Sequence, residues 1–303
     1  MKYNFDFLED NKLSDIAKSV LAFYIPIALE IPSLRDNPEL MSVEVKAENA
    51  EGVQDVATQA DKYVQAKIKK HLPEDWQFWG EEGEDNVSEF DESKEYMLIT
   101  DPIEGTNNFR AKIDDQWGSV ISVVDIETKK PVIGIVAHPF KKTFYLGIKD
   151  NGAFKLVIDE EGLQHSKLTS EPQSGYDYFT YNNSPHFSKE LSSQVSKFFE
   201  KGTVKPNDTE DKLLSSRKSL SIDDERFEDP ESGALEVVRN KGTIYFKTSN
   251  EMSACFVILK EIGVYITDGN GNDWTLGINT LISAREKEDY DFLKKLYDDS
   301  ISE

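Results

Sequence analysis

The chain has 303 residues, of which 38% are hydrophobic and 30% are charged, and its formal net charge at pH 7 is −22. A chain of this length and composition can bury a large core, as one large domain or as two packed halves. The negative charge argues against nucleic-acid binding, because a phosphate backbone requires a basic face.

The sequence predicts neither a membrane span nor a signal peptide. The most apolar early stretch, residues 16–31, is interrupted by Lys18 and Glu30, whereas a spanning helix needs about 20 mainly apolar residues. The single cysteine, Cys255, allows no internal disulfide and is compatible with a reducing compartment. We therefore expect a cytoplasmic protein with no membrane partner.

The residue types favour a hard metal ion over zinc. The histidines are widely scattered and lack zinc-site spacing, whereas acidic residues are abundant. Carboxylate oxygens suit magnesium and similar ions. Bound cations would also reverse the local field for an anionic substrate. The four histidines are His71, His138, His165 and His186.

In chain order, the first elements are two helices and a strand. Apolar residues recur at helical spacing over residues 12–31, and Pro32 should end that helix. Residues 33–52 are mostly polar and predict a loop. A second helix is expected over residues 62–71, followed by a short aromatic strand at 76–83 that ends in two acids.

Acidic residues flank this second helix. Asp61 follows Thr58 by three residues, so the two can form a capping box. Alternatively, Asp61 faces a metal site and orients an attacking water. At the strand end, we expect only one of Glu81 and Glu82 to face a metal, because neighbouring side chains on a strand point to opposite faces.

The central stretch is residues 96–109. Its apolar run is typical of a buried strand, and Asp101 stands where that strand should leave the sheet. Open α/β sheets hold their ligands at such strand ends. Pro102 stiffens the exit, so the carboxylates of Asp101 and Glu104 can converge with the carbonyl of Ile103 on a hard cation.

Gly105 and Thr106 can open a helix whose N–H groups face the same place, which suits a phosphate. Two acids and a phosphate share one site only with cations between them, so the stretch indicates a metal-dependent phosphatase. The alternative is that Asp-Pro-x-Glu-Gly forms an ordinary turn.

After the central stretch, the sequence predicts an antiparallel meander over residues 118–152. The patterns that indicate secondary structure are weaker in the remainder of the chain. An almost wholly apolar helix over 252–261 must be buried, and Glu251 directly precedes it. Glu251 is either a favourable charge near the helix dipole or a metal ligand at the rim of a cavity. The other expected elements are helices at 187–201, 235–240 and 289–298 and strands at 243–246 and 264–268.

Four blocks in this order resemble the inositol monophosphatase family of magnesium-dependent, lithium-sensitive phosphatases. The resemblance covers residues 53–154 well and residues 235–268 moderately. The blocks are Val56-Ala-Thr58-Gln-Ala-Asp61, Gly80-Glu81-Glu82, Asp101-Pro-Ile-Glu104-Gly-Thr106-Asn-Asn-Phe109 and Asn250-Glu251-Met-Ser-Ala254.

The resemblance implies an α+β or α/β protein folded as a layered α-β-α-β-α sandwich of the sugar-phosphatase type. We expect an N-terminal half, residues 1–154, with the metal site and the meander. A C-terminal half, residues 155–303, should close the site and contribute substrate specificity. Dimers are common in that family, so a homodimer is one assembly that the resemblance allows, and the sequence leaves the oligomeric state open.

The resemblance further implies two or three Mg²⁺ ions and a complete set of site residues. A metal-bound water held by Glu81 and Thr106 would attack phosphorus in line, with Asp61 as the third catalytic residue. Phosphate would rest on the N–H groups of Gly105 and Thr106. The implied metal ligands are Glu81, Asp101, the Ile103 carbonyl, Glu104 and Glu251.

Two ligand positions depart from the family pattern. Glu104 and Glu251 stand where the family has Asp, and Asn250 replaces a Trp. Each longer acid adds one methylene, and catalytic geometry is sensitive to shifts of about 1 Å. The related fructose-1,6-bisphosphatases also place Glu at the later position.

The leading hypothesis is a magnesium-dependent phosphomonoesterase that hydrolyses a small phosphorylated metabolite. Inositol phosphates, sugar phosphates and nucleotide 3′-phosphates are the expected substrate classes. The alternative is a non-catalytic metal- or phosphate-binding relative with altered ligands, Glu104 and Glu251. Residues 156–230 do not align with the family pattern, so the sequence assigns no substrate.

Overall fold

A computed structural model describes most of the first half of the chain and parts of the second. The statements below concern these parts alone. They are residues 3–48, 54–86, 89–114, 117–169, 176–182, 204–207, 225–228, 235–245, 250, 252–278 and 280–301.

The chain divides into two compact units, which we describe separately. The first comprises Met1–Leu168 with Asn250–Glu261, and the second Thr169–Ser249 with Ile262–Glu303. The described helices are α1 (Lys12–Leu34), α2 (Gln59–Lys69), α3 (Thr106–Ala111), α6 (Met252–Glu261) and α7 (Lys287–Ile301).

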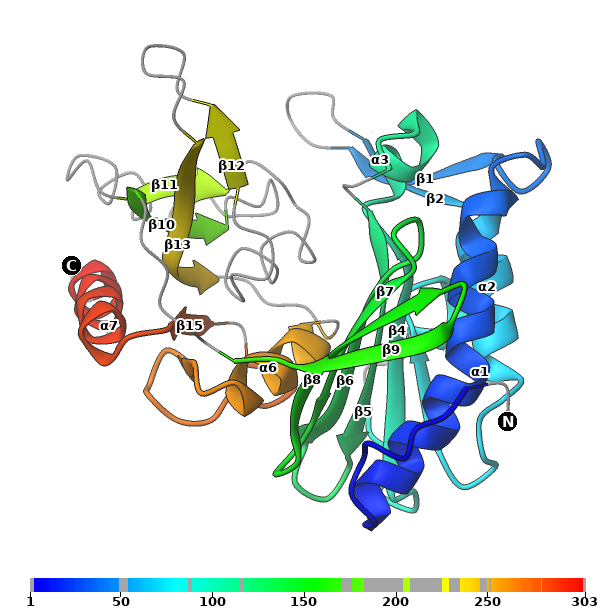
Figure 1. The fold of residues 1–303 in the computed structure, drawn as a ribbon, viewed down its shortest axis with the longest axis horizontal. Coiled ribbons are helices and arrows are strands. Elements are labelled where there is room, and N and C mark those ends of the chain that lie inside the picture. The colour runs from blue at the N-terminus through cyan, green and yellow to red at the C-terminus, as the bar shows by residue number, and fades with distance from the viewer. Residues whose placement is uncertain are drawn as a thin grey trace. The chain divides into compact units, whose positions relative to one another are not determined.

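The first unit is built on a sheet in the order β3-β4-β5-β6-β7-β8-β9 (Figure 1). The β3–β4 pair is parallel and the remaining pairs are antiparallel, which confirms the predicted meander. The strands are β3 (Gln77–Gly80), β4 (Tyr96–Glu104), β5 (Gly118–Asp125), β6 (Lys130–His138), β7 (Thr143–Ile148), β8 (Gly152–Asp159) and β9 (Gly162–Lys167).

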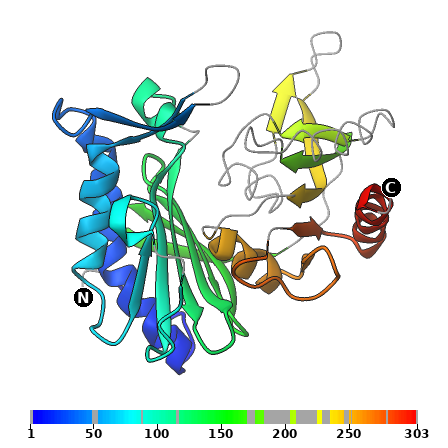
Figure 2. The same cartoon turned by 180° about the vertical axis from the view of Figure 1, so that it is seen from behind.

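Helices cover both faces of this sheet (Figures 1 and 2). Ile133 and Ile135 of β6 belong to the core that also contains the buried face of α1. Gly134 lies between them and faces α6, where an added Cβ would be 2.1 Å from the Ala254 carbonyl oxygen. Because side chains alternate along a strand, α1 and α6 lie on opposite faces.

The N-terminal helix differs from its prediction. Helix α1 contains both Pro26 and Pro32 and continues to Leu34, so its predicted end at Pro32 is wrong by two residues. Within the described ranges it is the one helix that is long and apolar enough to cross a membrane, because it extends beyond the stretch 16–31 at both ends. A core helix passes the same test, and in the structure Leu21, Ile25 and other apolar side chains of α1 are buried in the core.

A β-hairpin replaces part of a predicted loop. The stretch 33–52 was expected to lack regular structure, but β1 (Val43–Glu48) pairs antiparallel with β2 (Gln54–Thr58), which leads directly into α2. The valines of β1 are exposed, whereas Val56 and Ala57 of β2 are buried, so only β2 packs its side chains into the protein. Its strand character comes from β-branched residues that alternate with charged ones.

The second unit contains a sheet in the order β11-β10-β13-β15-β14, with β12 also paired to β13. The predicted helix at 235–240 is wrong, because β13 is a strand that pairs with three neighbours. The predicted helix 187–201 lies outside the described residues. The strands are β10 (Tyr176–Asn182), β11 (Val204–Asn207), β12 (Glu225–Glu228), β13 (Leu235–Tyr245), β14 (Tyr265–Thr267) and β15 (Leu281–Ala284).

Candidate metal and phosphate site

Asp61 lies in the first turn of α2 and uses its two carboxylate oxygens differently. Its Oδ2 accepts hydrogen bonds from the Thr58 backbone N–H at 2.8 Å and the Thr58 hydroxyl at 2.5 Å. Its Oδ1 lies 3.3 Å from the hydroxyl of Thr106, which is 45 residues away in the chain. The capping interpretation and the site interpretation of Asp61 therefore apply to different atoms of one carboxylate.

The environment of Asp61 changes its acidity. Its exposed fraction is 1%, and burial raises its pKa from 3.8 to about 7. Hydrogen bonds from Thr58 act in the opposite direction, and the negative charge of Glu82 adds to the increase. A carboxyl group with a pKa near neutrality can hold or release a proton at physiological pH, as many functional-site groups do.

Strand β4 is longer than predicted and includes both central acids, Asp101 and Glu104. It continues to Glu104 instead of ending at Asp101, and all of its residues are buried. Pairing with β5 is irregular between Asp101 and Glu104, where Pro102 has no N–H to donate. Within this irregularity the Ile103 N–H donates to Asp101 Oδ1 at 3.1 Å. The Asp-Pro-x-Glu segment is therefore a distorted strand end and not an ordinary surface turn.

The Gly-Thr step opens α3 as expected. Gly105 has φ 83° and ψ 42°, a left-handed conformation that a side chain would strain. The Thr106 hydroxyl lies 3.0 Å from the Ile103 carbonyl oxygen, so it lies between that oxygen and Asp61. Asp61, Asp101, Ile103 and Thr106 are thus connected through short polar contacts.

Glu81 and Glu82 follow β3 at the same end of the sheet. The Glu81 N–H donates to the carbonyl of Thr100, the residue before Asp101, at 3.3 Å. The Lys46 ammonium lies 3.0 Å from Glu81 Oε1 and 2.6 Å from Glu82 Oε1. Both carboxylates thus contact one ammonium, and strand alternation does not separate them because β3 ends at Gly80. That only one of the two acids faces a metal stays a prediction.

These charges affect one another. Burial raises the pKa of Glu82, although its ion pair with Lys46 acts against the increase. Burial also disfavours the charged form of Lys46, but its pKa is nevertheless raised by Glu81 and Glu82. The Lys46 ammonium therefore acts as an internal counter-ion for the acid pair. Sequence reasoning missed Lys46 because its strand was expected to be a loop.

The donor set fits a hard cation in chemical type. Asp101 and Glu104 are buried, Glu81 is partly exposed, and the Ile103 carbonyl lies between the first two in the chain. Among the described residues, however, no three Asp, Glu, His or Cys side chains are close enough to hold a metal ion. Glu251, the remaining predicted ligand, lies outside the described residues. The ammonium group on Glu81 indicates that this end of the sheet attracts positive charge.

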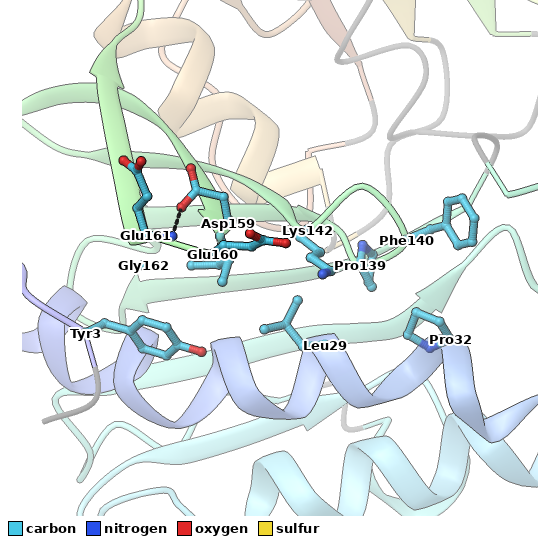
Figure 3. A pocket seen from close by; sticks show the side chains of 11 residues that line it. Tyr3, Leu29, Pro32, Pro139, Phe140, Lys142, Asp159, Glu160, Glu161 and Gly162 are labelled. Carbon is cyan, nitrogen blue, oxygen red and sulfur yellow. Dashed lines mark hydrogen bonds between the residues drawn. The ribbon is translucent and has the colours of Figure 1, made fainter.

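A separate cavity of about 620 Å³ lies elsewhere in the first unit (Figure 3). One wall contains Tyr3, Leu29 and Pro32, and the other contains the β6–β7 and β8–β9 turns. No predicted site residue that the structure describes lines it. The cavity is therefore not the candidate metal and phosphate site.

Comparisons with known proteins point to one family. The model of the Inositol monophosphatase family matches residues 31–301. Inositol monophosphatase 3 of Solanum lycopersicum is 31% identical over 143 residues, which cover 41% of this chain and 52% of that protein. The matched region thus covers about half the length of this relative.

Solved structures share the fold at low identity. Staphylococcal inositol monophosphatase-1 in a LiCl-soaked inhibitory complex has a TM-score of 0.68 and 19% identity, covering 95% of this chain and 96% of that chain. An IMPase/NADP phosphatase complexed with Mg²⁺ and phosphate has a TM-score of 0.67 and 18% identity, covering 94% and 96%. The predicted α/β sandwich architecture is confirmed.

Proposed function

Because the chain belongs to the inositol monophosphatase family, we propose that it is a phosphomonoesterase that depends on a divalent cation, with Mg²⁺ as the expected ion. The observation that carries the proposal is the position of the Thr106 hydroxyl, 3.3 Å from Asp61 Oδ1 and 3.0 Å from the Ile103 carbonyl. These contacts bring together three residues from two of the sequence blocks that suggested a phosphatase.

The proposed metal ligands are oxygen donors at the ends of β3 and β4 and before α6. When bound, Mg²⁺ would neutralise phosphate charge and lower the pKa of a coordinated water. Glu81 forms an ion pair with Lys46 through Oε1, so a bound cation would compete with the Lys46 ammonium for that carboxylate. The ligands are the carboxylates of Glu81, Asp101, Glu104 and Glu251 and the carbonyl of Ile103.

The chain's own groups would then position the reactants. Thr106 can orient a water through its hydroxyl, and Asp61 Oδ1, 3.3 Å away, can accept the hydrogen bond that fixes the orientation of that hydroxyl. Glu81 is the other proposed catalytic residue. The N–H groups of Gly105 and Thr106 are the proposed phosphate contacts. Helix α3 has only six residues, so family membership supports this assignment more than the helix dipole does.

The proposed substrate is a small phosphorylated metabolite: an inositol phosphate, a sugar phosphate or a nucleotide phosphate. The similar IMPase/NADP phosphatase supports including nucleotides. Glu231, Ser232 and Gly233, which lie outside the described residues, are the proposed contacts to the leaving group. A homodimer is the proposed assembly.

The test is inorganic phosphate release by the purified chain, with Mg²⁺ or with chelator. The panel contains inositol 1-phosphate, fructose 1,6-bisphosphate, adenosine 3′,5′-bisphosphate and NADP. We expect chelator-sensitive release that Li⁺ inhibits and that Asp101→Asn abolishes, because Asp101 is a proposed ligand. Release that survives both chelator and Asp101→Asn would contradict the proposal.

Two observations favour a second candidate, a relative that binds metal or phosphate without turnover. Glu104 is one methylene longer than the family's Asp, and the described acids are not assembled around one point. If no compound of the panel released phosphate while calorimetry still detected Mg²⁺ binding, this candidate would be supported. Glu104→Asp would then be the first variant to assay for restored phosphate release.

A further inference from the structure

Gln65 is a buried polar residue of α2 that neither the sequence blocks nor the proposed chemistry uses. It lies four residues after Asp61, so both side chains project from the same face of the helix. Its exposed fraction is 4%. A buried amide must find hydrogen-bond partners, so its partners show what it holds.

The Gln65 amide pairs with both backbone groups of one residue. The Glu82 N–H donates to Gln65 Oε1 at 3.0 Å, and Gln65 Nε2 donates to the Glu82 carbonyl at 2.8 Å. The same Nε2 lies 3.1 Å from Asp85 Oδ2. Strand β3 ends at Gly80, so Gln65 provides the backbone pairing just beyond the strand.

Gly80 makes this arrangement possible. A Cβ added to Gly80 would lie 2.3 Å from Gln65 Cδ and 2.4 Å from Gln65 Oε1. Because Gly80 has no side chain, the amide can lie directly against the end of β3. Any larger residue would have to displace the amide from Glu82.

The segment Glu81–Glu82 is therefore held from two sides. On one side the Glu81 N–H donates to Thr100, next to Asp101 on β4. On the other side Gln65 holds Glu82, while Asp61 from the same helix contacts Thr106. Helix α2 thus connects the strand end that carries Glu81 to the segment that carries Asp101 and Thr106.

We propose that Gln65 is a positioning residue for the metal site: its hydrogen bonds to the Glu82 backbone fix where the Glu81 carboxylate can meet the other ligands. The inference rests on the proposed function, since it concerns the same site. Groups that are hydrogen-bonded directly to metal ligands typically change metal affinity about 10–100-fold when they are removed. Gln65 acts through the backbone of the residue next to Glu81, so we expect an effect at the lower end of this range.

Gln77 supplies a matched control. Its amide also joins two backbone groups, donating to the Glu89 carbonyl at 2.8 Å and accepting from the Asp91 N–H at 2.9 Å. Gln77 is three residues before Gly80, at the opposite end of β3 from the site. Gln77 therefore makes the same kind of bridge between backbone groups as Gln65, but away from the site.

The experiment measures Mn²⁺ binding to the full chain by electron paramagnetic resonance, together with thermal melts. We expect Gln65→Met to weaken Mn²⁺ binding about 10-fold or more and Gln77→Met to leave it within about twofold. Gly80→Ala should reproduce the loss, because it displaces the amide without removing it. This second variant keeps the test decisive if Gln65→Met does not fold.

If the wild-type chain bound Mn²⁺ and both Gln65→Met and Gly80→Ala bound it with equal affinity, the inference would be overturned. The proposed function would remain intact. Equal weakening by Gln77→Met would also overturn it, because the effect would then be general destabilisation. If the wild-type chain bound no Mn²⁺, the proposed function would fail and this inference with it.

Discussion

At the scale of single residues, Asp61 shows how one carboxylate can stabilise a helix and serve a site. One oxygen caps α2 through Thr58, and the other lies near the Thr106 hydroxyl. Burial and the nearby Glu82 raise the cost of ionising it, which is the reason for its raised pKa. In the metal-free protein, burial therefore makes the charged form of Asp61 unfavourable.

This raised pKa predicts a pH-dependent stability without metal. A carboxyl whose folded pKa is about 7, against 3.8 unfolded, stabilises the fold most when protonated. That contribution is complete below about pH 4 and is lost as the pH rises through about 7. Asp61→Asn cannot titrate, so wild type should lose stability relative to this variant as the pH rises.

The measurement is the difference in melting temperature between wild type and Asp61→Asn, taken in chelator from about pH 5 to about pH 8. Other titrating groups largely cancel in the difference. A difference that stays constant over this range would show that Asp61 keeps an ordinary pKa.

At the scale of elements, α3 depends on its surroundings. A six-residue helix is too short to be stable by itself. Phe109 anchors it in the core, and the guanidinium of Arg35 from the end of α1 lies 4.7 Å from the Phe109 ring and 4.9 Å from the Trp117 ring. Arg35 also forms an ion pair with Asp114. The helix that carries the proposed phosphate contacts is thus fixed by a buried cation.

We expect Arg35→Met to lower the free energy of unfolding by about 2 kcal/mol, because it removes a desolvated cation–π interaction and an ion pair. Arg35→Lys should recover only part of this loss, since an ammonium cannot stack as a planar guanidinium does. Urea denaturation of the three proteins is the measurement. Equal midpoints for wild type and Arg35→Met would show that Arg35 does not stabilise this region.

At the scale of the whole molecule, the net charge of −22 determines how the protein responds to ions. Like charges destabilise a compact state, and salt screens them. Any salt should therefore stabilise the chain to some extent. A cation that binds the folded site should add stability that depends on its own concentration.

We expect MgCl₂ to raise the melting temperature more than NaCl at matched ionic strength, because specific binding adds to screening. In Asp101→Asn the two salts should have similar effects, since the proposed ligand is lost. Thermal melts of both proteins in both salts provide the comparison. If NaCl matched MgCl₂ in the wild-type chain, screening alone would account for the stabilisation.

Long helices, the meander and the strand–acid–Gly-Thr stretch could be predicted from the sequence because their signals are local. Apolar spacing predicted α1 and α2, and an almost wholly apolar run predicted α6. Short strands separated by turns predicted the sheet of the first unit. The predicted helix at 235–240 failed because pairing with neighbouring strands decides the conformation of β13. Local propensity is a weak guide where tertiary contacts compete with it.

The residues of the candidate site could be proposed from the sequence, since four motif blocks with acids, a glycine and a threonine are visible without coordinates. Only the tertiary structure showed that Lys46 pairs with Glu81 and Glu82, and that Gln65 holds Glu82 beneath Gly80. These contacts join residues from separate elements. Their existence depends on where β3 ends and how α2 packs, and sequence spacing does not specify either.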